Sequence, residues 1–104
     1  MVARDAIQEF CGRLVELYHP QKILLFGSYA YGTPGADSDV DLLVVMPLVG
    51  PAASMSADIM IRLAPGFPVD VLVRSPEMLA ARLEAGDFFL REIMEKGIVL
   101  HEAA

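Results

Sequence analysis

The sequence predicts an α/β (α+β) fold, a small mixed β-sheet flanked by helices. Short apolar runs rich in Val, Ile and Leu alternate with segments whose apolar residues recur every three or four positions. Pro, Gly and Ser bound most of these segments, and no repeat, low-complexity tract or long linker divides the 104 residues. Strands that alternate with helices are typical of a sheet covered by helices, and we expect a single domain over residues 1–104.

The N-terminal segment, residues 3–18, is predicted to form an amphipathic helix. Its apolar residues recur at helical spacing, with charged residues on the other side. The apolar side consists of Ile7, Phe10, Cys11, Leu14 and Tyr18. Pro20 ends this helix, because a proline disfavours helix in the residue before it. We expect Cys11 to be a buried, inert thiol, and a single cysteine excludes a disulfide framework and a cysteine metal site.

Three apolar runs bounded by Pro, Gly or Ser are predicted to be buried strands. They are KILLFG at 22–27, SDVDLLVVM at 38–46 and FPVDVLVR at 67–74. A helix is expected at 53–64, with its apolar side formed by Met55, Ile59 and Leu63. Ser75 and Pro76 suit the start of another helix, which runs to Lys96 with a break near Gly86. IVLH at 98–101 closes the chain as a short strand or edge segment.

The charge balance of the chain is acidic. The formal net charge is −6, with 14 acidic residues against 8 Lys and Arg. Autonomous binding to DNA or RNA needs a patch that neutralises phosphates, so we do not expect it. A divalent cation or a basic protein partner suits this charge better. No apolar stretch is long enough to cross a membrane and the N-terminus lacks a signal-peptide pattern, so we expect a soluble, cytoplasmic protein.

Three aspartates alternate along the sequence before an apolar run. Asp37, Asp39 and Asp41 fall at every second position, which places them about 6–7 Å apart on one face of a strand. Carboxylates gathered beside buried residues repel one another unless something neutralises them. Two carboxylates on one strand face can hold two divalent ions, and Mg²⁺ prefers such ligands. Asp37 lies in PGADSD, where turn chemistry explains it as well as a catalytic role does, so we leave it out of the site.

The Gly27-Ser28 pair follows the first strand directly. A strand-to-helix turn of this kind presents backbone N–H groups and a hydroxyl to an anion, although a plain structural turn is the alternative. The ten residues before Asp39 leave room for a short helix and a turn, so the second strand can lie beside the first. Asp70, an isolated acid in a run of Val and Leu, completes a three-acid site if its strand is the next neighbour. The alternative is an edge-strand acid that faces water.

Together these features resemble the minimal nucleotidyltransferase (MNT) domain of the DNA polymerase β nucleotidyltransferase superfamily. The resemblance rests on Gly27-Ser28, ten residues, Asp39-x-Asp41 and the later strand acid Asp70. It covers nearly the whole chain, including GDFFLREIMEKGIVLHE at 86–102, which is similar to the family's closing helix and strand. It implies a polymerase β-like nucleotidyltransferase fold.

The resemblance also implies the contents of the site. Two Mg²⁺ ions are expected at Asp39 and Asp41, with Asp70 as third ligand and general base. A nucleoside triphosphate, usually ATP, is expected to meet the Gly27-Ser28 turn with its phosphates. The family commonly has an arginine where GSYAYG has Tyr31. This departure leaves the metal ligands intact and bears on nucleotide affinity.

Short MNT proteins are typically the antitoxins of HEPN/MNT toxin–antitoxin pairs. The resemblance therefore implies an adenylyltransferase that moves AMP from ATP to a hydroxyl, a tyrosine of a partner HEPN ribonuclease. One rival is a non-catalytic antitoxin that neutralises its partner by contact, which the Tyr31 departure favours slightly. A second rival is transfer to a small molecule, as in aminoglycoside nucleotidyltransferases, which carry an extra helical domain for which this chain has no room.

Other residues have plainer explanations. Tyr29 and Tyr31 flank the Gly27-Ser28 turn, where nucleotide contact and ordinary packing are equally open. Arg74 ends the Asp70 strand and is read as a solvated charge. Neither His19 nor His101 has a second metal ligand nearby in sequence. A set of apolar residues near the C-terminus is read as core or partner contacts: Leu79, Leu83, Phe88, Phe89 and Ile93.

Overall fold

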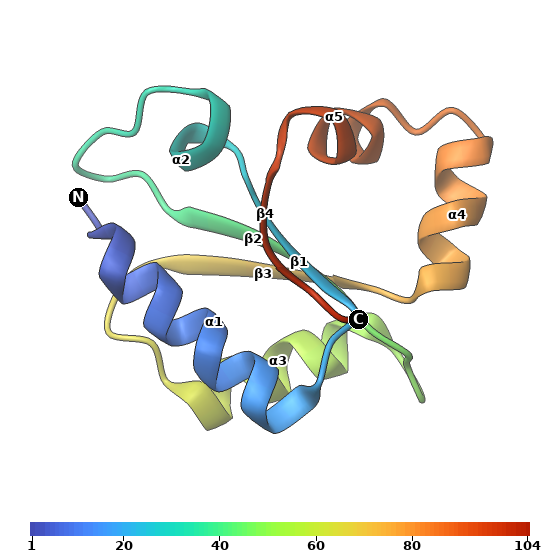
Figure 1. Ribbon diagram of the computed structural model, residues 1–104, viewed down its shortest axis with the longest axis horizontal. Helices are drawn as coiled ribbons and strands as arrows, with labels where there is room; N and C mark the ends of the chain where they lie inside the picture. The colour runs from blue at the N-terminus through green and yellow to red at the C-terminus, as the bar shows by residue number, and fades with distance from the viewer.

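The computed structural model describes residues 1–104 and arranges them in three layers. A four-stranded sheet lies between α1 and α3 on one side and α4 and α5 on the other (Figure 1). In chain order the elements are α1 (Arg4–Tyr18), β1 (Lys22–Phe26), α2 (Ser28–Tyr31), β2 (Val40–Val45), α3 (Ala52–Leu63), β3 (Val69–Arg74), α4 (Pro76–Glu84), α5 (Phe88–Lys96) and β4 (Ile98–Glu102). The predicted class, a mixed sheet flanked by helices, is confirmed.

The sheet has the strand order β3-β2-β1-β4. β1 pairs antiparallel with both β2 and β4, whereas β2 and β3 run parallel. Parallel neighbours need a crossover connection, and α3 supplies it between β2 and β3. The C-terminal segment expected as a strand or edge segment is the edge strand β4. β3 forms the opposite edge.

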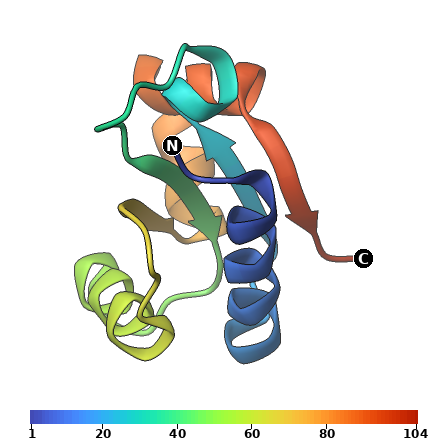
Figure 2. The ribbon, with the colours of Figure 1, turned by 90° about the vertical axis from the view of Figure 1, so that its left-hand side faces the viewer.

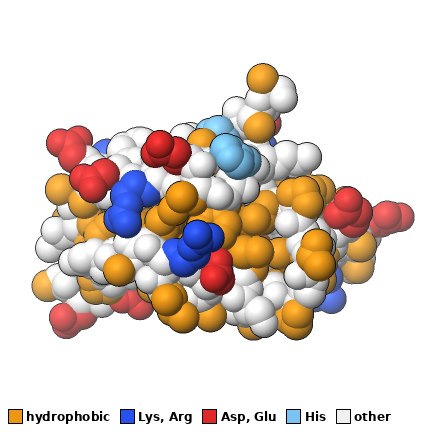
Figure 3. All heavy atoms as spheres, turned by 90° about the horizontal axis from the view of Figure 1, so that it is seen from below, with side chains coloured by type: hydrophobic (Ala, Val, Ile, Leu, Met, Phe, Trp, Pro, Cys, Tyr) orange, Lys and Arg blue, Asp and Glu red, His pale blue; other side chains and the backbone are white.

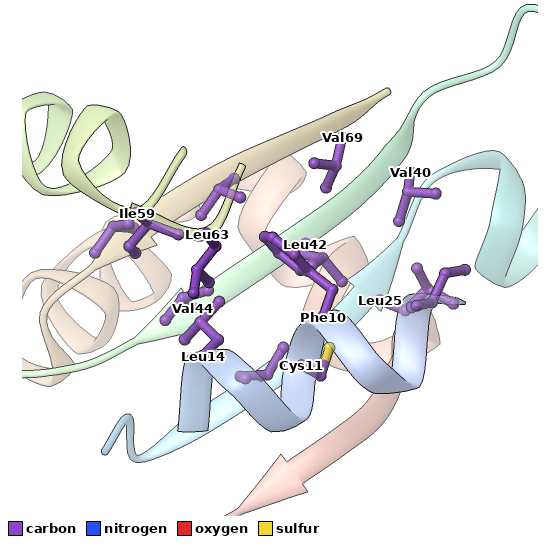
Figure 4. Packing of buried hydrophobic residues seen from close by; sticks show 14 of the residues in the cluster. Phe10, Cys11, Leu14, Leu25, Val40, Leu42, Val44, Ile59, Leu63 and Val69 are labelled. Carbon is purple, nitrogen blue, oxygen red and sulfur yellow. The ribbon is translucent and has the colours of Figure 1, made fainter. Parts of the chain in front are cut away.

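A larger core lies between the sheet and the helices α1 and α3. The apolar side of α1 is buried, with Phe10, Cys11 and Leu14 no more than 3% exposed. Figure 4 shows these side chains against Leu42 and Val44 of β2 and near Ile59 and Leu63 of α3. Burial raises the pKa of the Cys11 thiol to about 11, which agrees with the inert thiol expected from the sequence.

A smaller core fills the other face of the sheet, beneath α4 and α5. It contains Leu24 and Phe26 of β1, Leu43 and Val45 of β2, and Leu79, Leu90 and Ile93 of the two helices. Successive strand residues point to opposite faces, so the apolar run of β2 divides between the two cores. Both faces of this strand are covered, which explains why its sequence reads as a continuous apolar stretch.

Several predicted boundaries shift in the structure. β2 begins at Val40 and not at residue 38, and β3 begins at Val69 and not at residue 67. The break predicted near Gly86 is confirmed, because α4 and α5 are separate helices and Gly86 between them adopts a left-handed conformation with φ of 88°. Asp87 then caps α5, since its side chain accepts a hydrogen bond from the Leu90 N–H at 3.0 Å.

The ends and the outer surface complete the description. In Figure 2 the N-terminus lies beside α2, and the Val2 N–H donates to the Tyr29 hydroxyl at 2.9 Å. Figure 3 views the molecule from the side of α1 and α3, where apolar side chains lie among acidic and basic ones without a broad basic patch. None of the helices combines the length and the apolar character needed to cross a membrane.

Candidate functional site

Asp41 and Asp70 lie side by side on the parallel strands β2 and β3. The two strands are in register, with Asp41 paired to Asp70. Their neighbours Val40 and Val69 belong to the larger core, so both aspartates point to the face covered by α4 and α5. Neighbouring strands are about 4.8 Å apart, so the two carboxylates start from almost adjacent positions. The sequence-based expectation that the strand of Asp70 is the neighbour of the strand of Asp41 is confirmed.

Asp70 is exposed and β3 is an edge strand. The alternative from the sequence, an edge acid in contact with water, therefore describes its surroundings correctly. This exposure does not exclude a site that Asp70 shares with Asp41, because the strand register places the two residues side by side. A half-buried acid next to an exposed one is accessible from solvent, as a ligand site must be.

Gly27 holds the turn between β1 and α2 against the Asp41 carboxylate. Its φ of 73° and ψ of −152° lie in a region open essentially to glycine alone. A Cβ at this position would collide with Oδ2 of Asp41. Phe26, the residue before it, pairs with Asp41 across the antiparallel β1–β2 ladder. The glycine is thus required both by its backbone conformation and by the close approach of a predicted site residue.

α2 begins immediately after this glycine at Ser28. The N–H groups of Ala30 and Tyr31 donate to the Gly27 carbonyl, each at 3.0 Å. The N–H groups of Ser28 and Tyr29 donate to no backbone carbonyl, as is usual in a first helical turn. The predicted strand-to-helix turn at Gly27-Ser28 is therefore present, and its Gly27 lies against Asp41.

Asp39 and Asp37 occupy less regular backbone ahead of β2. Asp39 is exposed and precedes the first strand residue, so the expectation that it lies within the strand is wrong. The Val40 N–H donates to the Pro68 carbonyl at 3.0 Å and holds this segment beside the start of β3. Asp37 lies in a turn in which the Ser38 N–H donates to the Gly35 carbonyl at 3.2 Å. The even spacing of the three acids in sequence thus conceals three different environments.

The electrostatics of the site centre on Asp41. Partial burial raises the pKa of its carboxyl above the ordinary value of 3.8, and the charges of Asp70 and then Asp39 raise it further. None of the three carboxylates accepts a hydrogen bond or forms an ion pair with a cationic side chain. The cluster therefore carries negative charge that no group of the chain neutralises.

The donor set fits a divalent cation that other ligands also bind. No group of three or more His, Cys, Asp and Glu side chains is gathered closely enough to enclose a metal ion by itself. Mg²⁺ does not require such an enclosure, because proteins usually bind it through one or two carboxylates together with waters and substrate phosphates. The unpaired carboxylates of Asp41 and Asp70, next to the Gly27 turn and open to solvent, suit that kind of shared coordination.

A pocket of about 550 Å³ opens over these residues. Figure 1 shows α2 and α5 close together above the end of β1, and both helices contribute to its walls. Its lining residues are Phe26, Gly27, Tyr31, Asp41, Asp70, Val71, Leu72, Phe89 and Glu92. The pocket therefore joins the glycine turn, two of the acids and a set of aromatic side chains.

Two of the lining residues were not predicted as site residues. Phe89 is predicted from the sequence to be a core or partner contact; its exposed fraction of 55% excludes the core and leaves a partner contact as a prediction, and its neighbour Phe88 is 82% exposed. The sequence position of Glu92 predicts no role in a site, because an acid in the middle of an amphipathic helix usually faces solvent. Only the packing of α5 over β1 brings these positions to the pocket, and no local sequence signal reports that contact.

The remaining polar candidates lie elsewhere. Arg74 is at the far end of β3 from Asp70, and its guanidinium donates to the Val73 carbonyl at 2.7 Å. The prediction that Arg74 is a solvated charge at the end of the strand, outside the site, agrees with this position. Neither His19 nor His101 belongs to a group of metal-binding side chains.

The comparison with known families agrees with this geometry. The model of the family described as "Nucleotidyltransferase domain" matches residues 6–100. The chain belongs to this family. As a nucleotidyltransferase, it is expected to act on a nucleotide substrate, and the pocket with its acids lies within the matched residues.

Individual relatives of this nucleotidyltransferase span nearly all of it. A protein of Methanocaldococcus jannaschii named "Putative protein adenylyltransferase MJ0604" is 32% identical over 109 residues, which cover 97% of this chain and 100% of the relative. The crystal structure of "a putative nucleotidyltransferase from Sulfolobus solfataricus" has a TM-score of 0.62 at 16% identity, over 91% of this chain and 76% of that one. A structure described as a toxin–antitoxin with AMP-PNP has a TM-score of 0.59 at 20% identity, over 92% and 73%. At these identities the two solved structures support the fold.

Proposed function

We propose that this nucleotidyltransferase is an adenylyltransferase that moves AMP from ATP to a hydroxyl group of a partner protein. The observation that carries the proposal is the Asp41–Asp70 pair, set side by side and packed against the Gly27 turn. The choice of a protein acceptor is supported by the name of the Methanocaldococcus jannaschii relative, a protein adenylyltransferase. The choice of an adenine nucleotide is supported by that name and by the AMP-PNP named for one structural neighbour.

The reaction exchanges one phosphate bond for another. The acceptor oxygen bonds to the α-phosphorus of ATP, the bond from that phosphorus to the α–β bridging oxygen breaks, and pyrophosphate leaves. The proton of the attacking hydroxyl passes to the carboxylate of Asp70, which is exposed and so can meet an incoming acceptor. The free N–H groups at Ser28 and Tyr29 and the Ser28 hydroxyl orient the phosphates. The phosphates can come close to the backbone at Gly27, because glycine has no Cβ.

Asp39, Asp41 and Asp70 are the residues that would hold divalent metal, in our proposal two Mg²⁺ ions. Bound there, the ions would neutralise the charge that develops on the transferred phosphoryl group and activate the attacking oxygen. Asp41 is suited to the central role, because it contacts Gly27 on one side and lies beside Asp70 on the other.

The partner we propose is a HEPN-type ribonuclease toxin, with a tyrosine of that protein as the acceptor. The toxin–antitoxin named for one structural neighbour supports a toxin as the partner, and the HEPN class is supported by the resemblance to MNT proteins. The net charge of −6 suits a basic partner surface. The chain would then act as the antitoxin of such a pair.

Labelling with [α-³²P]ATP tests the proposal. The full chain is incubated with Mg²⁺ and the protein encoded beside its gene, and wild type is expected to label that partner. Asp41→Asn is expected to reduce labelling by about 100-fold or more, because it removes the central carboxylate. Asp37→Asn is the matched control, since it changes an exposed aspartate that lies in the turn ahead of β2.

A rival function is neutralisation of the partner by contact alone. It is favoured by Tyr31, which occupies the position of a common family arginine and leaves the pocket without any Lys or Arg. If wild type silences the partner without labelling it, and Asp39→Asn/Asp41→Asn silences it equally well, the contact hypothesis replaces the enzymatic one. Transfer to a small molecule would appear as labelled product that is not protein.

A further inference from the structure

Phe89 forms an exposed aromatic wall of the pocket. It lies at the start of α5 and leaves 55% of its surface accessible. Its ring meets the ring of Phe26 at 5.7 Å between centroids with an interplanar angle of 85°, an edge-to-face contact that restrains its orientation. Phe26 is itself paired with Asp41 across the sheet, so only one side chain separates this exposed ring from the acidic pair.

Charge divides the pocket into two parts. Its charged lining residues are Asp41, Asp70 and Glu92, and no Lys or Arg lines it. Phosphates can therefore enter only where cations accompany them, which is at Asp41 and Asp70 beside Gly27. The remaining walls, with Phe89 and Tyr31 as aromatic members and Glu92 as their one acid, repel a phosphate but accept an uncharged ring.

A nucleoside triphosphate matches this division. Its charged end is the triphosphate, and its uncharged end is a planar base that any aromatic side chain can stack upon. The pocket, at about 550 Å³, lies within the range of roughly 300–1,000 Å³ typical of ligand sites. Both ends of the nucleotide can thus be accommodated in one continuous pocket.

We propose that Phe89 is the base-stacking residue of the nucleotide site, a role that rests on the proposed function. Contact with Phe26 holds its ring in place, and the nucleobase covers the surface that the fold leaves exposed. Because every base has a π-face, this contact adds affinity for a nucleotide without choosing among bases. Phe89 binds the ring of the nucleotide and takes no part in making or breaking the phosphate bond.

Calorimetric titration of the full chain in Mg²⁺ tests this role with two probes. One is α,β-methylene-ATP, which binds without reacting, and the other is inorganic tripolyphosphate, which has no base. Wild type is expected to bind the nucleotide at least about fivefold more tightly than tripolyphosphate. Phe89→Leu, which keeps apolar bulk and removes the ring, is expected to weaken the nucleotide about 5- to 100-fold and leave tripolyphosphate within about twofold.

Two variants serve as controls. Phe89→Tyr keeps the ring and is expected to retain nucleotide affinity within about twofold. Phe88→Ala removes an aromatic residue that is 82% exposed and does not line the pocket, so it is expected to leave both probes unaffected. Thermal unfolding of each variant shows whether a change in the contact between residue 89 and Phe26 has destabilised the fold.

The outcomes separate this inference from the function on which it rests. Wild type that binds neither probe in Mg²⁺ overturns the proposed function. Wild type that binds both probes equally well overturns the stacking role without any variant, because the base then contributes nothing. The role is also overturned if Phe89→Leu retains nucleotide affinity, or if it weakens both probes by the same factor.

Discussion

The substitution Gly27→Ala probes the contact between the glycine turn and Asp41. An alanine would have to adopt φ of 73° and ψ of −152°, and its Cβ would collide with Oδ2 of Asp41. The backbone strain alone costs on the order of 1–3 kcal/mol. The collision adds to this unless the carboxylate moves away, which would displace it from Asp70.

Two quantities are therefore expected to fall together. The free energy of unfolding should drop by about 2 kcal/mol, which lowers the melting temperature by roughly 10 °C in a domain of this size. Mg²⁺-dependent affinity for α,β-methylene-ATP should fall about tenfold or more, as is usual when the support of a metal-binding carboxylate is lost. Urea unfolding and calorimetric titration measure the two effects separately.

Gly12→Ala is the matched control. Gly12 lies within α1, it is exposed, and a Cβ there meets no atom within 4 Å. Alanine is a better helix former than glycine by about 1 kcal/mol, so this variant should be more stable than wild type. In the double variant the gain should offset part of the lost stability but restore none of the nucleotide affinity.

Unchanged stability and affinity in Gly27→Ala would show that the backbone conformation of residue 27 imposes no strain on alanine and that its Cβ does not displace Asp41. A variant that loses stability but binds nucleotide as wild type does would refute the positioning of Asp41 by this turn. Recovery of affinity in the double variant would show that Gly27→Ala acts through global stability alone.

Three further predictions concern single residues. Asp41→Asn should make the chain more stable than wild type at pH 7 in EDTA, because it removes a carboxylate whose pKa is raised by burial and by the charges of Asp70 and Asp39. A raised pKa means that the folded state holds this proton more tightly than the unfolded chain, so this group's stabilising contribution is lost as pH rises from 3.8 through the folded pKa. The advantage of Asp41→Asn in urea unfolding should therefore grow over that interval, and a constant difference at all pH values would contradict it. Ala64→Gly should raise the free energy of unfolding by about 0.5–1 kcal/mol, since Ala64 ends α3 at φ of 42°; a loss of stability would exclude strain there. Ser75→Ala should cost about 1 kcal/mol, because the Ser75 hydroxyl caps α4 at 3.1 Å from the Met78 nitrogen, and an unchanged melting temperature would show that the cap contributes nothing.

Much of the fold was predictable because its signals are local. The spacing of apolar residues in α1 reports a buried face directly, and the apolar runs at 22–27 and 38–46 report buried strands. The Gly27-Ser28 turn was predictable as well, since a glycine that ends a strand indicates a special conformation. The prediction that Asp39 lies within the strand was wrong because acids recur at every second position even before the first hydrogen-bonded residue of the strand. The sequence pattern therefore extends farther toward the N-terminus than the strand does.

Other features depend on which elements become neighbours. The exposed acid Asp70 has the same local signature whether it faces water alone or lies beside Asp41, and only the parallel register of β2 and β3 decides between these arrangements. Phe89 has the sequence signature of a core residue, because an aromatic residue at the start of an amphipathic helix is normally buried. Its exposure at a pocket wall follows from the packing of α5 over β1.

The elements and the glycine turn were therefore predictable from the sequence, because they depend on interactions between residues close in the chain. The tertiary structure decided that Asp41 meets Asp70, that Gly27 abuts the Asp41 carboxylate, and that Phe89 borders the resulting pocket. These contacts join β1, β2, β3 and α5, which are distant in sequence. They are set by strand order and layer packing, which no local pattern of residues can specify.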